Sequence, residues 1–236
     1  MLDKFDVDNL KQCVKDSLDK SQGFEGICYR GVWKDYANQF DLVCSVGSFI
    51  TGGRYNQEGS FGVLYLACDP KTCIEELVHS IHNSPSQMAN GLPRMLVSIK
   101  VKLSKVLRLN KEYLLDSIKI KKSELVNHEW TKKQLQSLDE TLGQLIGRTA
   151  RENGFEGILV PSARWDGCNL NVFPDNLQDK SKLEIMNVKL LNPPITIDYK
   201  NHRDNVISIL EKRLGKGLVR DQENSLFFSL DNLSFY

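Results

Sequence analysis

The clearest regularity in the chain is the alternation of apolar and polar residues over RMLVSIKVKL (94–103). A period of two is typical of a strand with one buried side. The apolar positions of the stretch are Met95, Val97, Ile99, Val101 and Leu103. Because the opposite side is mainly polar, we predict an antiparallel sheet with one solvated face. A second strand, KVLRL (105–109), is predicted to follow directly.

Shorter apolar runs predict the other strands of this sheet. They fall at 27–32, around 43–50, and at 63–67, 156–160, 169–173 and 183–191. A glycine-rich stretch, TGGRYNQEGSFG (51–62), predicts a sharply turned loop that leads into the buried strand 63–67.

Apolar residues at a spacing of three to four predict the helices. The first covers 3–20 and is closed by Gly23 and Gly26, and the second follows Asp69-Pro70 and ends before Ser84-Pro85. The others cover 131–152, with Gly154 just past the end, and 203–214; residues 111–130 form a polar, helical or irregular insertion. Many short strands with helices in a few clusters favour an α+β domain with a bent or split, mainly antiparallel sheet flanked by helices.

Composition and charge exclude some classes of partner. Lys and Arg number 31 against 30 Asp and Glu, so the net charge is +1. Proteins that bind nucleic acids or anionic membranes need a positive excess, so we expect neither partner. Acids interrupt the N-terminal segment from Asp3 onward, and no apolar run reaches the roughly 18 residues of a membrane span. We expect a cytoplasmic protein, with delivery into another cell left open.

The cysteines and histidines give no metal motif. The six cysteines are scattered without a C-x-x-C pair, which predicts neither a zinc site nor a disulfide framework. Reduced thiols are the expected state in the cytosol. His79 and His82 could share a helix face, but no third ligand lies nearby in the sequence. We therefore expect no metal.

Three charged residues interrupt otherwise apolar segments. Arg30 lies in ICYRGV, Arg54 in the GGRYN turn and Glu76 on the helix after VLYLA. A buried charge without a partner costs several kcal/mol, so these residues need an explanation. A structural Arg–Glu pair is one; a site for an anionic ligand is the other.

Four ordered blocks of the sequence resemble the RES domain family. They are CYRG (28–31), GGRYNQEG (52–59), VLYLACDPKTCIEEL (63–77) and GFEGILVPSARWDGCNLNVF (154–173). Arg54, Tyr65 and Glu76 follow one another at intervals of eleven residues, as in that family. Together the blocks cover roughly residues 25–190. Tyr55 stands where tryptophan is frequent in the family.

The resemblance implies a fold similar to that of ADP-ribosyltransferases and an enzyme that consumes NAD⁺ as its substrate. Many members of the family are toxins that break the nicotinamide N-glycosidic bond. Their common partner is an antitoxin encoded beside them, and a homodimer is also implied. The C-terminal extension could block the pocket, bind an immunity protein or mediate delivery.

The resemblance also implies roles for individual residues. Arg30 and Arg54 would hold the pyrophosphate with their planar donors, and Gly53 would let the backbone approach the substrate. Glu76 would stabilise positive charge at the ribose or order its hydroxyls. The neighbouring Glu75 points about 100° away on a helix, so only one of the two can face the pocket.

Three further residues complete the expected site. Tyr65 would offer its ring to nicotinamide or its hydroxyl to ribose, although a strand tyrosine can also simply fill the core. Ser162 would donate to ribose or phosphate, or act as an ordinary turn former. Asn169 would hold either the Ser162 loop or the substrate. Glu76, Arg54 and Tyr65 are the expected catalytic residues.

We expect three regions: an N-terminal helix that packs on the core (1–24), a RES-like catalytic domain (25–191) and a C-terminal extension (192–236). The leading hypothesis is an NAD⁺ glycohydrolase or phosphorylase. A mono-ADP-ribosyltransferase that modifies a protein and a catalytically silent binding module of the same fold are the alternatives.

Overall fold

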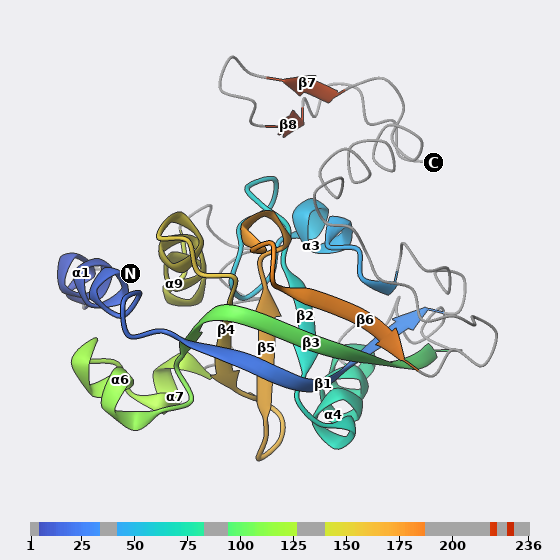
Figure 1. Cartoon of the computed structure of the whole chain (residues 1–236). Helices are drawn as coiled ribbons and strands as arrows, with labels where there is room; N and C mark the ends of the chain where they lie inside the picture. Colours follow the sequence, from blue (N-terminus) through green and yellow to red (C-terminus); the bar gives the residue numbers. More distant parts are fainter. Residues whose placement is uncertain are drawn as a thin grey trace.

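The computed structural model describes residues 5–33, 42–82, 94–126, 140–186, 218–220 and 226–228 (Figure 1). The strands of the main sheet are β1 (Gln22–Trp33), β2 (Leu64–Ala67), β3 (Arg94–Arg108), β4 (Gly157–Pro161), β5 (Cys168–Val172) and β6 (Lys182–Met186). The helices are α1 (Val7–Asp16), α3 (Val46–Thr51), α4 (Pro70–His82), α6 (Glu112–Ser117), α7 (Lys122–Leu125) and α9 (Leu142–Glu152), with a 3₁₀ turn at Pro174–Asn176. Two short strands, β7 (Leu218–Arg220) and β8 (Leu226–Phe228), pair with each other. The molecule is of the α+β class, as the sequence predicts.

The sheet bends until its strands close a ring. Its order is β1-β2-β5-β4-β3-β6, and β1 also pairs with β3. All of these pairs are antiparallel except β3 with β4. In Figure 1, β2, β4 and β5 run across the direction of β1, β3 and β6. The closing contact between β1 and β2 is a single residue pair, Tyr29 with Ala67, within the described part of the chain.

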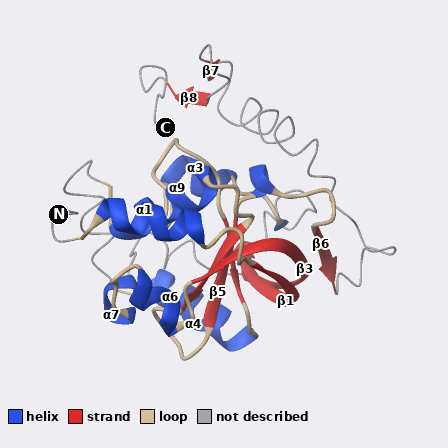
Figure 2. Cartoon of the chain, turned by 60° about the vertical axis from the view of Figure 1, so that its left-hand side comes forward, coloured by secondary structure: helices blue, strands red, loops and turns tan. Residues whose placement is uncertain are grey.

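Two apolar cores follow from the alternation of side chains along these strands. One combines residues of the five strands that close the ring, such as Cys28, Leu66, Ile99 and Leu170, with Leu183 and Ile185 of β6. The other includes Ile158 and Val160 of β4 and Leu107 of β3, together with buried residues of α1, α6, α7 and α9. Figure 2 shows the helices arranged around the strands. Helix α4 packs on β1 and β2 from outside.

Two regions differ from the prediction. Gly23 and Gly26 lie inside β1 instead of closing the first helix, which ends at Asp16. A Cβ on Gly23 would come within 2.6 Å of the carbonyl oxygen of Leu103, so this glycine permits close pairing with β3. The expected strand at 43–50 is wrong, because residues 46–51 form α3. That helix buries Val46 and Phe49, which are three residues apart.

The two strands predicted at 94–109 are one strand, β3, with a change of phase. Residues at odd positions are buried up to Leu103, whereas Val106 is the next buried position. The pairing with β1 is irregular at the same place. The fully buried carboxylate of Glu156 accepts backbone N–H bonds from Ser104 and Lys105 at this irregularity. Charge-assisted hydrogen bonds of this kind stabilise a break in the ladder.

Other predicted elements agree with the structure in type. The insertion at 111–130 contains α6 and α7, whose apolar side chains complete the second core. Helix α9 begins at Leu142, where Thr141 and Gln144 form a capping box, and Gly154 follows it with φ +82°. Residues 131–139, most of 192–236 and the predicted helix 203–214 lie outside the described residues. No described helix is long and apolar enough to cross a membrane.

Candidate active site

Three segments that are distant in sequence meet at the carboxylate of Glu76. The Ser162 hydroxyl donates a hydrogen bond to Oε1 of Glu76 at 2.7 Å, and Nδ2 of Asn169 donates to the same oxygen at 2.8 Å. Glu76 lies on α4, Ser162 directly follows β4 and Asn169 lies on β5. We call these three residues the Glu76 cluster. Within the described residues, Oε2 of Glu76 accepts no hydrogen bond, so one carboxylate oxygen is held and the other is open.

The Ser162 hydroxyl also organises the turn between β4 and β5. Its oxygen accepts the backbone N–H groups of Arg164 at 3.1 Å and Trp165 at 3.3 Å. With two donors pointing at the oxygen, the hydroxyl hydrogen is directed towards Glu76. The Lys71 ammonium lies 3.6 Å from the ring centroid of Trp165 and adds a cation–π contact between this turn and the start of α4.

The hydroxyl of Tyr65 is hydrogen-bonded to other groups of the protein. The hydroxyl donates to Oδ1 of Asn56 at 2.9 Å and accepts the backbone N–H of Tyr55 at 3.1 Å. Burial raises the pKa of Tyr65, so the phenol stays protonated and remains a donor. A hydrogen bond between this hydroxyl and ribose, the predicted role, would have to replace one of these two bonds. The half-buried ring is the part of Tyr65 that remains available to a ligand.

Gly53 is a glycine because the turn packs directly on Tyr65. A Cβ at this position would lie 2.3 Å from the Tyr65 hydroxyl. The turn closes by a hydrogen bond from the Gly53 N–H to the Asn56 carbonyl at 2.8 Å. The structure thus explains the glycine by internal packing, and its predicted contact with substrate stays a prediction.

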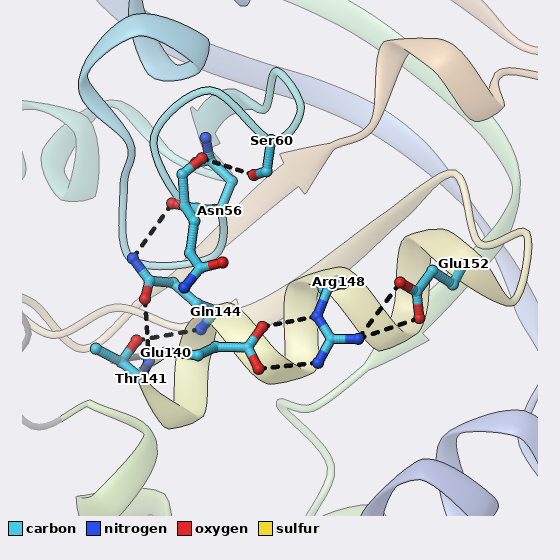
Figure 3. A network of polar contacts seen from close by, with 8 residues as sticks. Asn56, Ser60, Glu140, Thr141, Gln144, Arg148 and Glu152 are labelled. Atoms are coloured by element: carbon cyan, nitrogen blue, oxygen red, sulfur yellow. Dashed lines mark hydrogen bonds and ion pairs between the residues drawn. The ribbon is translucent and has the colours of Figure 1, made fainter. Parts of the chain in front are cut away.

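Helix α9 holds the turn that carries Arg54 (Figure 3). The Gln144 amide donates to the carbonyl oxygens of Gly53 at 3.2 Å and Asn56 at 3.4 Å. Gly147 and Gly143 let the helix approach the backbone of the same turn. Further along α9, Arg148 forms a two-pronged ion pair with Glu140 at 2.7 and 2.8 Å. The turn is therefore fixed by a helix that itself contributes no residue to the Glu76 cluster.

Arg54 and Glu76 act electrostatically on the same groups, among them Arg164. Arg54 acts on the pKa of both Tyr65 and Arg164, and the charge of Glu76 acts on Arg164 and Tyr55. Burial is the main cause that lowers the pKa of Arg164, Glu76 opposes this shift, and Arg54 adds to it. The charges of both Glu76 and Arg54 thus act on Arg164, and a pair of guanidinium groups is suited to an anionic ligand.

Arg30 lies on β1. It shares a side of the strand with Cys28 and Val32, which point into the ring. Its Nη1 donates to the Leu42 carbonyl at 2.9 Å. The charges of Arg30 and Glu76 both act on the Cys73 thiol of α4, so Arg30 lies near that helix. Its predicted contact with pyrophosphate stays a prediction.

Of the residues predicted for the site, the structure brings Glu76, Ser162 and Asn169 into contact, whereas Nη1 of Arg54 donates to the Leu125 carbonyl at 3.4 Å. Sequence reasoning missed Arg164 and the supporting Gln144. Arg164 lies in VPSARWDG, two residues after Ser162, and a charged residue inside this family block is the sequence signal that could have identified it. Gln144 gives no comparable signal, because it occupies an ordinary capping-box position.

Comparison with known proteins identifies the family. The RES domain profile matches residues 22–190, which include the main sheet and every residue of the Glu76 cluster. The chain belongs to the RES domain family, as its motifs predict.

Among solved structures, the chain is similar to one in the crystal structure of the M. tuberculosis MbcT–MbcA toxin–antitoxin complex. The identity is 16%, the match covers 83% of this chain and 96% of that chain, and the TM-score is 0.55. At this identity the likeness shows a shared fold. The search of curated proteins gave no match.

Proposed function

We propose that this protein is an NAD⁺-degrading enzyme of the toxin type, which cleaves the nicotinamide N-glycosidic bond by a glycohydrolase or phosphorylase reaction. The observation that carries the proposal is the asymmetry of the Glu76 carboxylate. Ser162 and Asn169 fix one oxygen, and the other accepts no hydrogen bond from the described residues. A carboxylate presented in this way can accept a ribose hydroxyl and stabilise positive charge at C1′.

The proposed reaction begins with heterolysis of the bond between ribose C1′ and the pyridinium nitrogen. The bonding electrons pass to the nitrogen, so the cationic ring leaves as neutral nicotinamide and C1′ becomes oxocarbenium-like. The negative charge of Glu76 stabilises this centre more than it stabilises the intact substrate. An acceptor oxygen then bonds to C1′ and loses its proton to solvent. Because the leaving group is neutral, the chemistry needs no metal.

The pyrophosphate of NAD⁺ matches the positive charges beside Glu76. Arg54, whose Nη1 also donates to the Leu125 carbonyl at 3.4 Å, and Arg164 both carry planar guanidinium groups of a kind suited to phosphate oxygens. The half-buried ring of Tyr65 offers a surface for the nicotinamide or ribose. Arg30 remains a candidate for a second contact with the substrate from the end of β1.

Changing Arg54 to alanine should raise the KM for NAD⁺ about tenfold or more, with a smaller effect on kcat, because it removes a charge that binds the substrate before and during reaction. Steady-state rates of nicotinamide release would measure both constants. Arg148→Ala, which removes an arginine from the outer part of α9, is the matched control and should leave KM near the wild-type value. Equal changes in the two variants would contradict a binding role for Arg54.

The products of the reaction identify the molecule that accepts the ADP-ribose group. Purified protein incubated with NAD⁺ should release nicotinamide together with ADP-ribose in buffer, or a phosphorylated ADP-ribose when inorganic phosphate is present. Mass spectrometry distinguishes the two by one phosphate group. If label from NAD⁺ instead accumulates on a protein in lysate, the enzyme is a mono-ADP-ribosyltransferase. Absence of nicotinamide under all conditions would contradict the proposal.

The family and the toxin–antitoxin structure of similar fold support two further parts of the proposal. The first is a cognate antitoxin or immunity protein as partner. The second is that the bent sheet is similar in fold to the sheet of ADP-ribosyltransferases. A homodimer is proposed on the family resemblance alone. The six free thiols and the need for NAD⁺ support action in the cytoplasm, either of the producing cell or of a target cell.

A further inference from the structure

Three cysteines lie in one row across the ring of strands. Tyr29 pairs with Ala67, and continuing this register by one residue past the end of β2 brings Cys28 of β1 opposite Cys68. Ala67 pairs in turn with Asn169, which places Cys68 opposite Cys168 of β5. All three thiols are free. The row lies at the contact between β1 and β2 that closes the ring.

The backbone hydrogen bonds decide which two of these cysteines are closer. The Cys68 N–H donates to the Cys168 carbonyl at 2.9 Å, so these two residues form a hydrogen-bonded pair. The N–H and C=O of a residue in a strand point to the same side, and those of Cys68 therefore point away from β1. Cys28 and Cys68 form a non-hydrogen-bonded pair, in which side chains approach more closely and Cα atoms lie about 4.5 Å apart instead of about 5.5 Å. That spacing is within the range that a disulfide spans.

The two thiols also differ in a way that suits them to different chemical roles. Cys28 is fully buried, whereas Cys68 is half-buried. A hydrogen bond from Cys28 lowers the pKa of Cys68, and the same contact together with burial raises the pKa of Cys28. Cys68 is thus the more accessible sulfur and the one that favours the thiolate, which is the reactive form.

We propose that Cys28 and Cys68 form a redox-sensitive pair that hydroperoxides oxidise to a disulfide across the β1–β2 contact. The Cys68 thiolate attacks one peroxide oxygen, the O–O bond breaks, and a sulfenic acid forms together with hydroxide from hydrogen peroxide or an alkoxide from an organic hydroperoxide. The Cys28 sulfur then attacks the sulfur of Cys68, the S–O bond breaks, and the thiol proton leaves with the hydroxyl group as water. With hydrogen peroxide, two thiols and one peroxide give one disulfide and two waters.

The disulfide would stabilise the contact between β1 and β2, where Tyr29 and Ala67 are the one paired set among the described residues. It would link β1, which carries Arg30, to the segment just before α4, which carries Glu76. Asp69 follows Cys68 directly and caps α4 by accepting the backbone N–H of Thr72 at 2.8 Å. The proposal concerns the bond itself and does not depend on the reaction proposed for the Glu76 cluster.

The test uses the full-length chain, reduced and then treated with hydrogen peroxide. After free thiols are blocked, peptide mapping by mass spectrometry without reduction should find one linked peptide pair, Cys28 with Cys68. The same pair should form in Cys168→Ser and be absent from Cys28→Ser. Oxidation should raise the Tm of the wild type and of Cys168→Ser by about 5–10 °C, and reduction should reverse the shift.

A bond between Cys68 and Cys168, or oxidation of Cys68 that stops at sulfenic or sulfinic acid, would overturn the proposal. So would the absence of any disulfide in both the wild type and Cys168→Ser. These outcomes are read from the wild type and Cys168→Ser, so they remain decisive even if Cys28→Ser, which changes a core position, does not fold.

Discussion

Changing Glu76 to glutamine should lower the kcat for nicotinamide release from NAD⁺ by about 10²–10³-fold. Glutamine keeps an amide oxygen that can accept the hydrogen bonds of Ser162 and Asn169, so the cluster can stay assembled. The lost negative charge is needed chiefly when positive charge develops at C1′. The loss should therefore appear in kcat, while KM stays within about threefold of the wild-type value.

Glu75 provides the matched control for this experiment. It adjoins Glu76 on α4, but the two side chains point about 100° apart on a helix. Glu75→Gln makes the same chemical change and should retain nearly full activity. Thermal unfolding of both variants would separate a loss of chemistry from a loss of fold. Equal losses of kcat in the two variants, or none in Glu76→Gln, would contradict the role assigned to Glu76.

Changing Gly147 to alanine should lower the free energy of unfolding by about 2–3 kcal/mol. The new Cβ would lie 1.9 Å from the Tyr55 carbonyl oxygen, far inside van der Waals contact. Either α9 or the turn that carries Arg54 must move, and both are backbone segments that cannot rotate out of the way. Because the Gln144 bonds depend on the same approach, the position of Arg54 should also change and KM for NAD⁺ should rise.

Gly47 is the control for the intrinsic effect of alanine in a helix. It lies in α3, and no atom would come within 4 Å of its added Cβ. Gly47→Ala should therefore be neutral or slightly stabilising, since alanine favours helix over glycine. Urea unfolding curves of the two variants measure the difference. A similar stability for Gly147→Ala and Gly47→Ala would show that α9 does not approach the turn as closely as described.

The sequence predicts the elements of this fold well where one local rule decides the structure. The alternation at 95–103 predicts the first part of β3, and Asp69-Pro70 predicts the start of α4. Such a local rule fails where a residue far away in the sequence helps to determine the local structure. Glu156 stabilises the phase change in β3 from a segment about fifty residues away, and nothing within 94–109 indicates that the strand continues. Similarly, α3 depends on burial of Val46 and Phe49, which a short apolar run does not distinguish from a strand.

For the candidate site too, the sequence predicts part of the arrangement and the fold is needed for the rest. Family motifs predict Glu76, Ser162 and Asn169 as separate residues, and only the fold shows that both partners bind one oxygen of the carboxylate. Tyr65 is predicted as a ligand for substrate, whereas its hydroxyl is committed to Asn56 and Tyr55. Arg164 was missed because its meaning depends on proximity to Glu76, a residue far away in sequence. Sequence thus proposes which side chains form the site, and the fold shows which of them contact one another.

If the Glu76 cluster cleaves the bond between ribose and a cationic nicotinamide ring, NMR observation of purified protein with equimolar NAD⁺ and NADH will show it. We expect free nicotinamide to appear as NAD⁺ is consumed, while NADH persists, because its uncharged ring would have to leave as an anion. Intact NAD⁺ after prolonged incubation, or equal consumption of the two nucleotides, would contradict it.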